Sequence, residues 1–505
     1  MLLFLLILIP ILAAAAILLG APAKQTALAA AGVNLVQTFT VCLSYSTADG
    51  SAQYQEMLRI PILPAWNLQF LLGVDGLSLI MLLLTAIVTV AALWVAPPVR
   101  NYERAYFASL LFISAGAMGA FASLDLFFFY AFHELALVPT FLLIGIWGSG
   151  DRQAAAWKIT VYLAVGSFIL LLGLIGLYLA VPADLRTFDI TVLQQHTDWI
   201  NPGSRNAIYL ALLIGFGILI SLFPFHTWAP SAYASFPAPG AMLHAGVIKK
   251  FGLYGLLRVA LPLLPDAAHH YAGLLLVLLV GNIIYCGLAT IGQKRLDLML
   301  GYSSVMHMGY IFLGIVSLNI IGATGAALLM FAHGLSIAAL FAISGQVRER
   351  TGTLAFAELG GLATPMPVLG FAFGLAAFAA IGLPGFANFP SEIMVFFGAF
   401  NNGNASPYSS WQIATVLALW GLVISAVYML RGYRAVFHGP VQDRWTGLAD
   451  ITTLRWPLIL LLAALLVAGF CPQIFVHLVK PVLAEFLAPK WHLAGPPVVV
   501  EFPAP

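Results

Sequence analysis

Five ionisable side chains lie in stretches of sequence that are otherwise apolar: Glu134, Lys250, His307, His333 and Glu392. A charged residue inside a membrane span costs roughly 2.5–3.5 kcal/mol on insertion scales, so residues of this kind are candidates for function. Protons move between groups that can change charge, and histidine titrates near neutral pH. A series of such groups favours proton transfer over the binding of an organic substrate. It also disfavours a sodium site, which needs a cluster of oxygen ligands.

Each candidate also has a structural interpretation. Glu134 could belong to a structural salt bridge, and Glu392 could be a helix cap, because it follows a helix break. The two histidines could be hydrogen-bonded core residues. Adjacent residues on a helix point about 100° apart, so we expect one of Lys249 and Lys250 to face a pathway and the other to snorkel.

The composition indicates that membrane-spanning helices hold these side chains. The 505 residues are 62% hydrophobic and 8% charged, whereas soluble proteins carry about 25% charged residues. We therefore predict an all-α polytopic protein in a lipid bilayer. The net charge of +2 argues against a nucleic-acid partner. Three widely spaced cysteines and the lack of GxGxxG or Walker motifs predict no metal, cluster or nucleotide site in this chain.

Apolar length predicts about fourteen spans. They lie near 2–20, 27–44, 72–95, 104–123, 125–148, 157–181, 206–238, 240–263, 271–292, 299–318, 321–346, 366–401, 410–436 and 456–477. We interpret the first as a spanning helix and not as a removed signal peptide. The polar stretches 45–70 and 182–205 are expected to be structured loops. Asp75 begins a span and is interpreted as structural, and Asp125 and Lys158 as interfacial.

The basic residues are unevenly distributed between the predicted loops. Most of the 21 Lys and Arg residues lie in the odd-numbered loops or at the span ends beside them. The positive-inside rule then places both termini on the non-cytoplasmic side.

Two predicted spans are unusually long, and each contains two prolines with the same spacing. These are 206–238 with Pro224 and Pro230, and 366–401 with Pro384 and Pro390. Proline removes a backbone donor and disfavours a continuous helix. Broken helices at matching positions of two halves, here roughly 104–263 and 271–436, indicate a transport path. Ordinary proline kinks are the alternative.

Several motifs resemble a known family. They are GVDGLS from Gly73, HELALVPTFLLIGIWG, HTWAPSAYASFPAPGAMLHAGVIKKFGLYGLLR, GYSSVMHMGY, HGLSIAALFAISGQ and LPGFANFPSEIMVFFGAF. The chain resembles the antiporter-like, Mrp-related membrane subunits of respiratory complex I (NADH-quinone oxidoreductase), of the subunit M or NADH dehydrogenase subunit 4 type. The resemblance implies two inverted five-helix repeats, each with a broken helix.

The resemblance also implies roles for the buried residues. Glu134 matches the fifth-helix glutamate, Lys250 the eighth-helix lysine and Glu392 the twelfth-helix glutamate. His307 and His333 match the pathway histidines. The repeats would occupy 104–263 and 271–436, with N-terminal helices and a loop in 1–96, and a loop, the last spanning helix and a tail in 437–505.

The chain departs from the family pattern at several positions. Leu219 replaces the seventh-helix lysine that pairs with the fifth-helix glutamate. Ser231, Tyr233 and Ser235 stand where the family tends to have Asp, His and Glu, and Asp297 where a lysine is common. Without its lysine, Glu134 should be neutral more often.

Three nearby residues could take over from the missing lysine: His133, His244 and Lys249. If none does, the first half-channel is altered. The sequence thus leaves open whether the first half conducts.

The family implies a proton-translocating subunit of a bacterial-type inner membrane, in which quinone reduction by partner subunits is coupled to proton transfer. NADH, FMN, iron–sulfur clusters and quinone would belong to those partners, and this chain would carry out no redox chemistry. Two alternatives remain. One is a cation/proton antiporter or ion-coupled uptake complex without redox partners, and the other is a structural subunit that no longer conducts.

Overall fold

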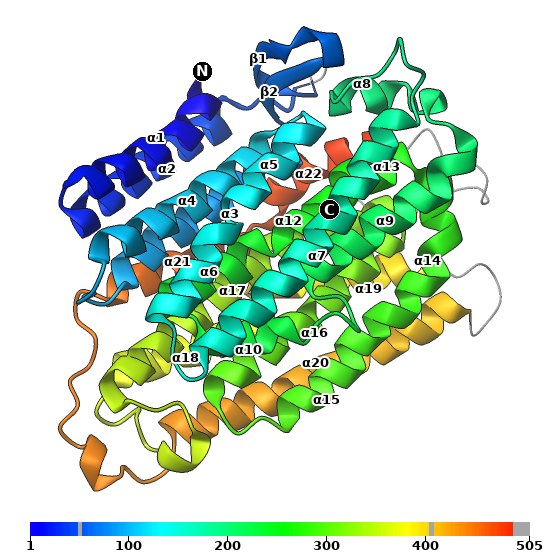
Figure 1. Cartoon of the computed structure of the whole chain (residues 1–505). Helices are drawn as coiled ribbons and strands as arrows, with labels where there is room; N and C mark the ends of the chain where they lie inside the picture. The colour runs from blue at the N-terminus through cyan, green and yellow to red at the C-terminus, as the bar shows by residue number, and fades with distance from the viewer. Residues whose placement is uncertain (49–52, 403–408, 488–505) are drawn as a thin grey trace.

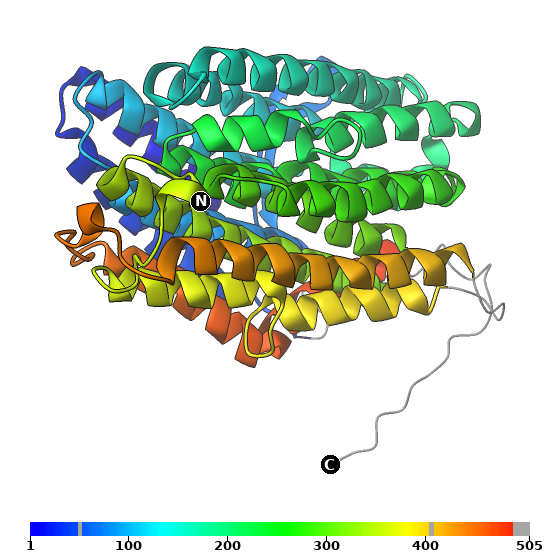
Figure 2. The ribbon, with the colours of Figure 1, turned by 90° about the horizontal axis from the view of Figure 1, so that it is seen from below.

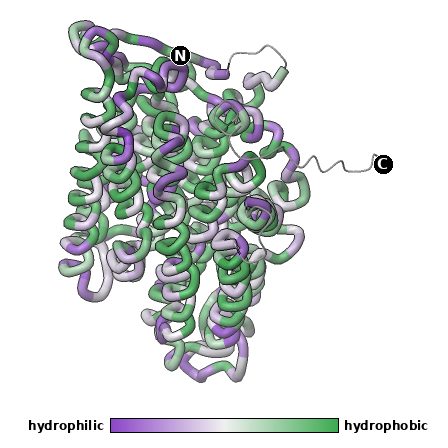
Figure 3. Tube along the Cα trace, turned by 90° about the vertical axis from the view of Figure 1, so that its right-hand side faces the viewer, coloured by the Kyte–Doolittle hydropathy of each residue, from purple (hydrophilic) through white to green (hydrophobic). Residues whose placement is uncertain are grey.

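A computed structural model describes residues 1–48, 53–402 and 409–487. The chain forms a bundle of roughly parallel helices, with one small β-hairpin at the end where the N-terminus lies (Figure 1). Turning the molecule shows the helices packed side by side in several layers (Figure 2). Hydrophobic residues fill the helix middles, and hydrophilic ones gather at ends and loops (Figure 3). The predicted all-α membrane fold is confirmed.

Three helices and the hairpin precede the region of the first predicted break. The elements are α1 (Leu2–Leu19), α2 (Ala23–Ser44), β1 (Gln55–Leu63), β2 (Leu68–Val74) and α3 (Gly76–Val95). The two strands pair antiparallel. Asp75 lies between the hairpin and α3, and its side chain accepts from the backbone N–H of Ser78. It is therefore the N-cap of α3, as the structural interpretation predicted.

The following helices surround the first predicted break. They are α4 (Glu103–Ala122), α5 (Leu126–Leu135), α6 (Leu137–Trp147), α7 (Arg152–Leu179), α8 (Ile190–Gln195), α9 (Pro202–Ile220), α10 (Trp228–Ser235), α11 (Ala238–Leu243), α12 (Lys250–Gly255) and α13 (Leu261–Leu263). Two π turns, 244–248 and 256–260, join the last three into one helical run. Asp125 caps α5 by accepting from the N–H groups of Phe127 and Phe128.

The second half contains the other predicted break. Its helices are α14 (Pro265–Val280), α15 (Cys286–Ile291), α16 (Leu296–Val316), α17 (Ile320–Thr351), α18 (Pro367–Ile381), α19 (Asn388–Phe400), α20 (Ser410–Phe437), α21 (Arg455–Phe470) and α22 (Pro472–Leu487). A further π turn, 281–285, joins α14 to α15. Both helix breaks predicted from the proline pairs are present, between α9 and α10 and between α18 and α19.

The number of spans differs from the prediction. Among the described residues, eleven helices are long and apolar enough to cross a membrane, or twelve if one bent pair counts as a span. The count of fourteen is therefore not confirmed. The bent pair is α21 and α22, which meet at 72°. Pro472 accounts for this bend, because a proline disfavours helical backbone at the residue before it, here Cys471. The last predicted span, 456–477, is thus wrong beyond Phe470.

Candidate functional site

Lys250, His333 and His307 form a line of buried polar side chains, which we call the polar line. Its centre lies where α12 contacts α17. The Lys250 Nζ is 2.9 Å from Nδ1 of His333 and donates to the carbonyl oxygen of Ala245 at 2.6 Å. Both side chains are buried. Ala245 belongs to the π turn before α12, and π turns are frequent at functional sites. At 2.9 Å a proton can pass directly between the amine and the imidazole.

His307 on α16 continues the line beyond His333. The two imidazole rings are 5.4 Å apart between centroids. The two ring nitrogens of His307 contact carbonyl oxygens, Nδ1 that of Ser303 at 2.8 Å and Nε2 that of Ala380 at 2.9 Å. Only the imidazolium has N–H donors at both positions. A neutral ring can therefore donate to only one of these two carbonyl oxygens at a time.

Ala380 belongs to the last turn of α18, directly before the second helix break. Carbonyl oxygens in a last turn lack partners within the helix, and this end of the helix dipole favours cations. The break thus places an acceptor where His307 can donate to it. The sequence predicted the break and the histidine, but not that the two meet.

Glu392 lies on the other side of the same break, in the second turn of α19. Gly382 has a left-handed φ of +81°, and a methyl group there would collide with Oε2 of Glu392. The backbone conformation therefore favours glycine, and any larger residue would also make the Glu392 carboxyl group shift. The structure brings Lys250, His333 and His307 to the second break, on whose far side Glu392 lies.

Several polar atoms near this break have no hydrogen-bond partner in the described part of the chain. They are Oε1 of Glu392, both side-chain polar atoms of Asn388 and the hydroxyl of Tyr310. Asn388 and Glu392 share one face of α19, because they are four residues apart. Each buried polar group without a partner costs about 1–3 kcal/mol. These groups are suited to hold water molecules between titratable residues.

The first break has a different chemistry. Asn282, from the π turn after α14, donates through Nδ2 to the carbonyl oxygens of Ser221 at 3.1 Å and Val305 at 3.0 Å. Its Oδ1 accepts from the N–H of Phe223 at 2.7 Å. Trp228 donates to the carbonyl oxygen of Ile218 at 3.0 Å. Neutral side chains therefore satisfy these backbone groups, while Oγ of Ser221 and Nδ1 of His226 at the same break are buried without a partner among the described residues. The sequence signal for Asn282, one amide in a long apolar run, was missed.

Glu134 lies at a kink between α5 and α6, and its side chain is 30% exposed. It accepts from the hydroxyl of Ser167 on α7 and lies 3.3 Å from Nδ1 of His133. Leu219 faces Gly166, the neighbour of Ser167, so an apolar side chain fills this part of the site. Among the described residues, no Lys or Arg lies within 4 Å of Glu134.

Lys249 points away from Lys250, towards α16 and α10. Its Nζ donates to the hydroxyl of Ser304 at 3.3 Å and lies 5.5 Å from the centroid of the Tyr233 ring. The Tyr233 hydroxyl is 3.4 Å from Nδ1 of His244. The prediction that one lysine snorkels is wrong, because Lys249 is 1% exposed.

The three candidates for replacing the missing lysine have different surroundings. His133 contacts Glu134, and its ring stacks on Phe251 with centroids 4.2 Å apart. His133 is the one of the three that touches the carboxylate, whereas Lys249 and His244 form a separate group with Tyr233.

Two buried carboxylates outside this line are fixed by arginines. Asp75 and Arg258, both fully buried, are joined by hydrogen bonds of 2.5 and 2.6 Å. Asp297 pairs with Arg295 at 2.7 Å and Arg348 at 2.6 Å. Asp297, which stands where the family commonly has a lysine, thus has two arginine partners in the structure. The sequence did not predict Arg258 as the partner of Asp75.

Comparison with known families identifies the chain. Residues 123–419 match the family described as NADH:quinone oxidoreductase/Mrp antiporter, transmembrane. The chain belongs to this family. The matched residues include both helix breaks and the five residues first singled out from the sequence.

Relatives of known name agree with this family. NAD(P)H-quinone oxidoreductase chain 4 of Gloeobacter violaceus is 35% identical over 94% of this chain and 90% of its own length. NADH-quinone oxidoreductase subunit M of Rickettsia conorii is 35% identical over 82% and 81%. The predicted family resemblance is therefore confirmed.

Solved structures show the same family fold. A chain of respiratory complex I from Thermus thermophilus superposes with a TM-score of 0.88 at 27% identity, covering 97% of this chain and 99% of that one. A chain of the Mrp complex from Dietzia sp. superposes with a TM-score of 0.83 at 21% identity, covering 97% of each. The second likeness shows the fold alone.

Proposed function

We propose that this chain is a proton-translocating, antiporter-like membrane subunit of a complex-I-type NADH-quinone oxidoreductase. The contact of Lys250 with His333, and of His307 with the second helix break, carries this proposal. These side chains form a buried line of titratable groups that reaches the break at which Glu392 lies. Lys250 and Glu392 would change charge at its two ends, with the histidines as relays.

The names of the relatives support the choice of complex. NADH, FMN, iron–sulfur clusters and quinone would be bound by partner subunits, and this chain would add proton transfer without redox chemistry of its own. Its partners would be other membrane-arm subunits in the inner membrane. The uneven distribution of basic residues among the predicted loops supports an orientation with both termini on the non-cytoplasmic side, under the positive-inside rule.

The two helix breaks support an organisation in two antiporter-like repeats, 104–263 and 271–436. Each contains one broken helix, α9–α10 in the first and α18–α19 in the second. Residues 1–96 and 437–505 would flank the repeats. The proposed proton pathway, from Lys250 to Glu392, would then run from the end of the first repeat through the second.

The fold shared with the Mrp chain favours one alternative, a cation/proton antiporter subunit without redox partners. Purification of the native complex separates the two. Co-purifying flavin and iron–sulfur subunits support the redox complex, and a complex that lacks them contradicts it.

The proton function is tested in membrane vesicles that contain the assembled complex, with quinone reduction and proton pumping measured together. Lys250→Ala and Glu392→Gln should each remove the pumping that depends on this chain. The exposed residues Lys480 and Glu103 supply controls, Lys480→Ala and Glu103→Gln, that should pump normally. Intact assembly with unchanged pumping in the first two variants would support a non-conducting structural subunit.

A further inference from the structure

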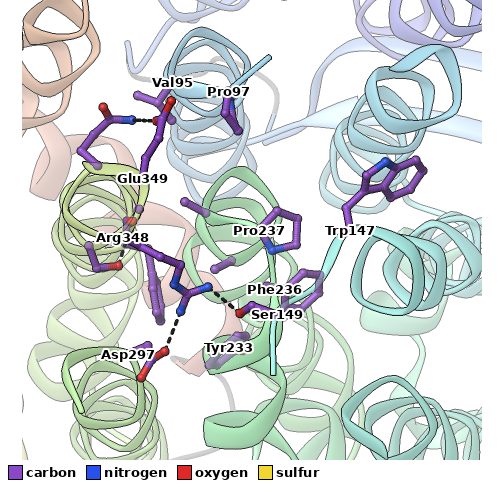
Figure 4. A pocket seen from close by; sticks show the side chains of 16 residues that line it. Val95, Pro97, Trp147, Ser149, Tyr233, Phe236, Pro237, Asp297, Arg348 and Glu349 are labelled. Carbon is purple, nitrogen blue, oxygen red and sulfur yellow. Dashed lines mark hydrogen bonds and ion pairs between the residues drawn. The ribbon is translucent and has the colours of Figure 1, made fainter. Parts of the chain in front are cut away.

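Two cavities adjoin at the loop end of the bundle, because Pro97, Trp147 and Pro237 line both of them. The first has a volume of about 250 Å³ and is shown in Figure 4, where the Arg348 guanidinium lies beside Asp297, 2.6 Å from its carboxylate. The second lies between the loop that joins α3 to α4 and the ends of α6 and α7 that face this loop. Its volume of about 450 Å³ is within the range of small-molecule sites, roughly 300–1,000 Å³. We call it the outer cavity.

The charged residues that line the outer cavity are Arg100 and Arg152. Among the described residues, no Asp or Glu lies within 4 Å of either guanidinium, and Arg100 makes no hydrogen bond at all. Asp151 accepts from the N–H of Ala154, Glu103 lies in the first turn of α4, and neither lines the cavity. The arginine of the first cavity is paired with a carboxylate, whereas the two arginines of the outer cavity are free to pair with an anionic ligand.

Hydrogen bonds within the protein hold the walls of the outer cavity in place. Trp147 donates through Nε1 to the carbonyl oxygen of Asn101 at 2.9 Å, which fixes the α3–α4 loop to the end of α6. Arg152 donates to the carbonyl oxygen of Ile146 at 2.6 Å. The Trp147 ring packs edge-on against the ring of buried Tyr106, with centroids 5.2 Å apart. The cavity is therefore formed before a ligand binds, and binding needs little further ordering of its walls.

The position of the outer cavity favours a phospholipid over a small soluble anion. The cavity lies where spanning helices end, which is the level of the headgroups of a bilayer. Ile146 lines the cavity and is 37% exposed, and exposed Trp157 and Val161 continue an apolar surface along α7. Trp157 packs edge-on against Phe141 of α6, so this surface crosses from one helix to the other. A phosphate held in the cavity can therefore keep its acyl chains against apolar side chains.

We propose that the outer cavity binds the headgroup of an anionic phospholipid. Arg100 and Arg152 donate to its phosphate oxygens, the pairing that guanidinium groups favour, and its acyl chains lie along Ile146 and Trp157. Basic pockets between spanning helices bind headgroups of this kind in the cytoplasmic leaflet. The bound lipid joins the α3–α4 loop to the α6–α7 loop. The site requires no proton transfer, so it goes beyond the proposed function.

Lipid binding is measured on the purified complex in phosphatidylcholine nanodiscs that contain increasing amounts of a photoreactive phosphatidylglycerol. Illumination should attach this lipid to peptides from 97–106 and 146–157, identified by mass spectrometry, and a photoreactive phosphatidylcholine should label them less. Unlabelled phosphatidylglycerol should compete, whereas inorganic phosphate should not. Peptides of the cavity that stay unlabelled while other lipid-facing peptides react would overturn the site. Equal competition by inorganic phosphate would overturn the assignment to a lipid.

Arg100→Gln removes one of the two charges and breaks no hydrogen bond within the described part of the chain. It should weaken binding of phosphatidylglycerol about fivefold, the effect of about 1 kcal/mol per basic residue near a membrane surface, and adding Arg152→Gln should weaken it further. Arg434→Gln is the matched control, because Arg434 is an exposed arginine at the same end of the bundle and lies outside the cavity. Size-exclusion chromatography checks that each variant complex is assembled. Equal labelling of the cavity in Arg100→Gln and Arg434→Gln would overturn the site, because lipid would then follow only the general charge of this end.

Discussion

The two helix breaks share a proline spacing but differ in what surrounds them. At the first, Asn282 and Trp228 give partners to the backbone groups that the break releases. At the second, His307 donates to one released carbonyl, and Glu392 and Asn388 keep polar atoms without a protein partner. Backbone groups of the first break are satisfied by neutral side chains, although Nδ1 of His226 there also lacks a partner among the described residues, and the second break differs by its buried carboxyl group, Glu392. A broken helix therefore frees backbone groups that can serve a functional site, and the side chains packed around the break decide whether they do.

The difference between the two breaks predicts that a charge pair can be built in the first half, between Glu134 and a lysine at position 219. Leu219→Lys should be tolerated where Glu134 can pair with it. In a Glu134→Gln background it should cost about 3–5 kcal/mol, because a buried charge is left unpaired. Thermal unfolding of the purified complex in detergent measures both variants.

A leucine two turns earlier provides the control for this pair. Leu212 is buried on the same helix and faces Gly173 instead of Gly166. Leu212→Lys should be destabilising to the same degree with or without Glu134. Equal losses for Leu219→Lys in both backgrounds would show that position 219 does not face the carboxylate.

Asn282→Ala should destabilise the chain by about 2–4 kcal/mol, because it removes three buried hydrogen bonds, two of them to the backbone of Ser221 and Phe223 at the first break. Complexes that still assemble should pump at the wild-type ratio of protons to quinone. A large fall in that ratio with stability unchanged would reverse the roles assigned to the two breaks.

Asn388→Ala should affect pumping more than stability, which is the opposite of what we expect for Asn282→Ala. It removes no protein hydrogen bond, so its cost in unfolding free energy should be about 1 kcal/mol or less. Pumping should fall, because a group suited to hold water beside Glu392 is lost. Pumping assays and thermal unfolding on the same preparations decide this, and a stable variant with normal pumping would contradict the prediction.

Ser167→Ala should have the smallest effect on pumping and should cost about 0.5–1.5 kcal/mol in unfolding free energy, because the Glu134 carboxylate that it leaves is partly exposed. Pumping should stay close to that of the unmodified complex. A strong pumping defect with full stability would show that the first half conducts, and would remove the functional difference between the halves.

The sequence predicted what depends on local chemistry. Apolar length predicted the helical membrane fold but not the number of spans, and the proline pairs predicted both breaks, because helices in lipid must satisfy their own backbone. The bend at Pro472 was missed, although a proline there disfavours a continuous helix. Sequence spacing could not reveal the partners of Lys250 or Asp75, since these lie 83 and 183 residues away.

The contacts of Lys249 show the same limit. An adjacent pair of lysines predicts that one side chain points elsewhere, but not what it meets there. In the sequence Tyr233 stands out only as a departure from the family pattern. Its position beside Lys249 and His244 follows from tertiary packing, which no local pattern encodes.

The buried Asp75–Arg258 pair has a consequence for the order in which the chain is made. The guanidinium lies 5.4 Å from the centroid of the Phe486 ring, on α22, the last described helix. During synthesis from the N-terminus, the carboxylate emerges first, the guanidinium much later and the ring that covers it last of all. Enclosure of this ion pair therefore cannot be complete until the chain is nearly finished. A nascent chain that stops early exposes a charged interior, which is a feature that quality-control machinery can detect.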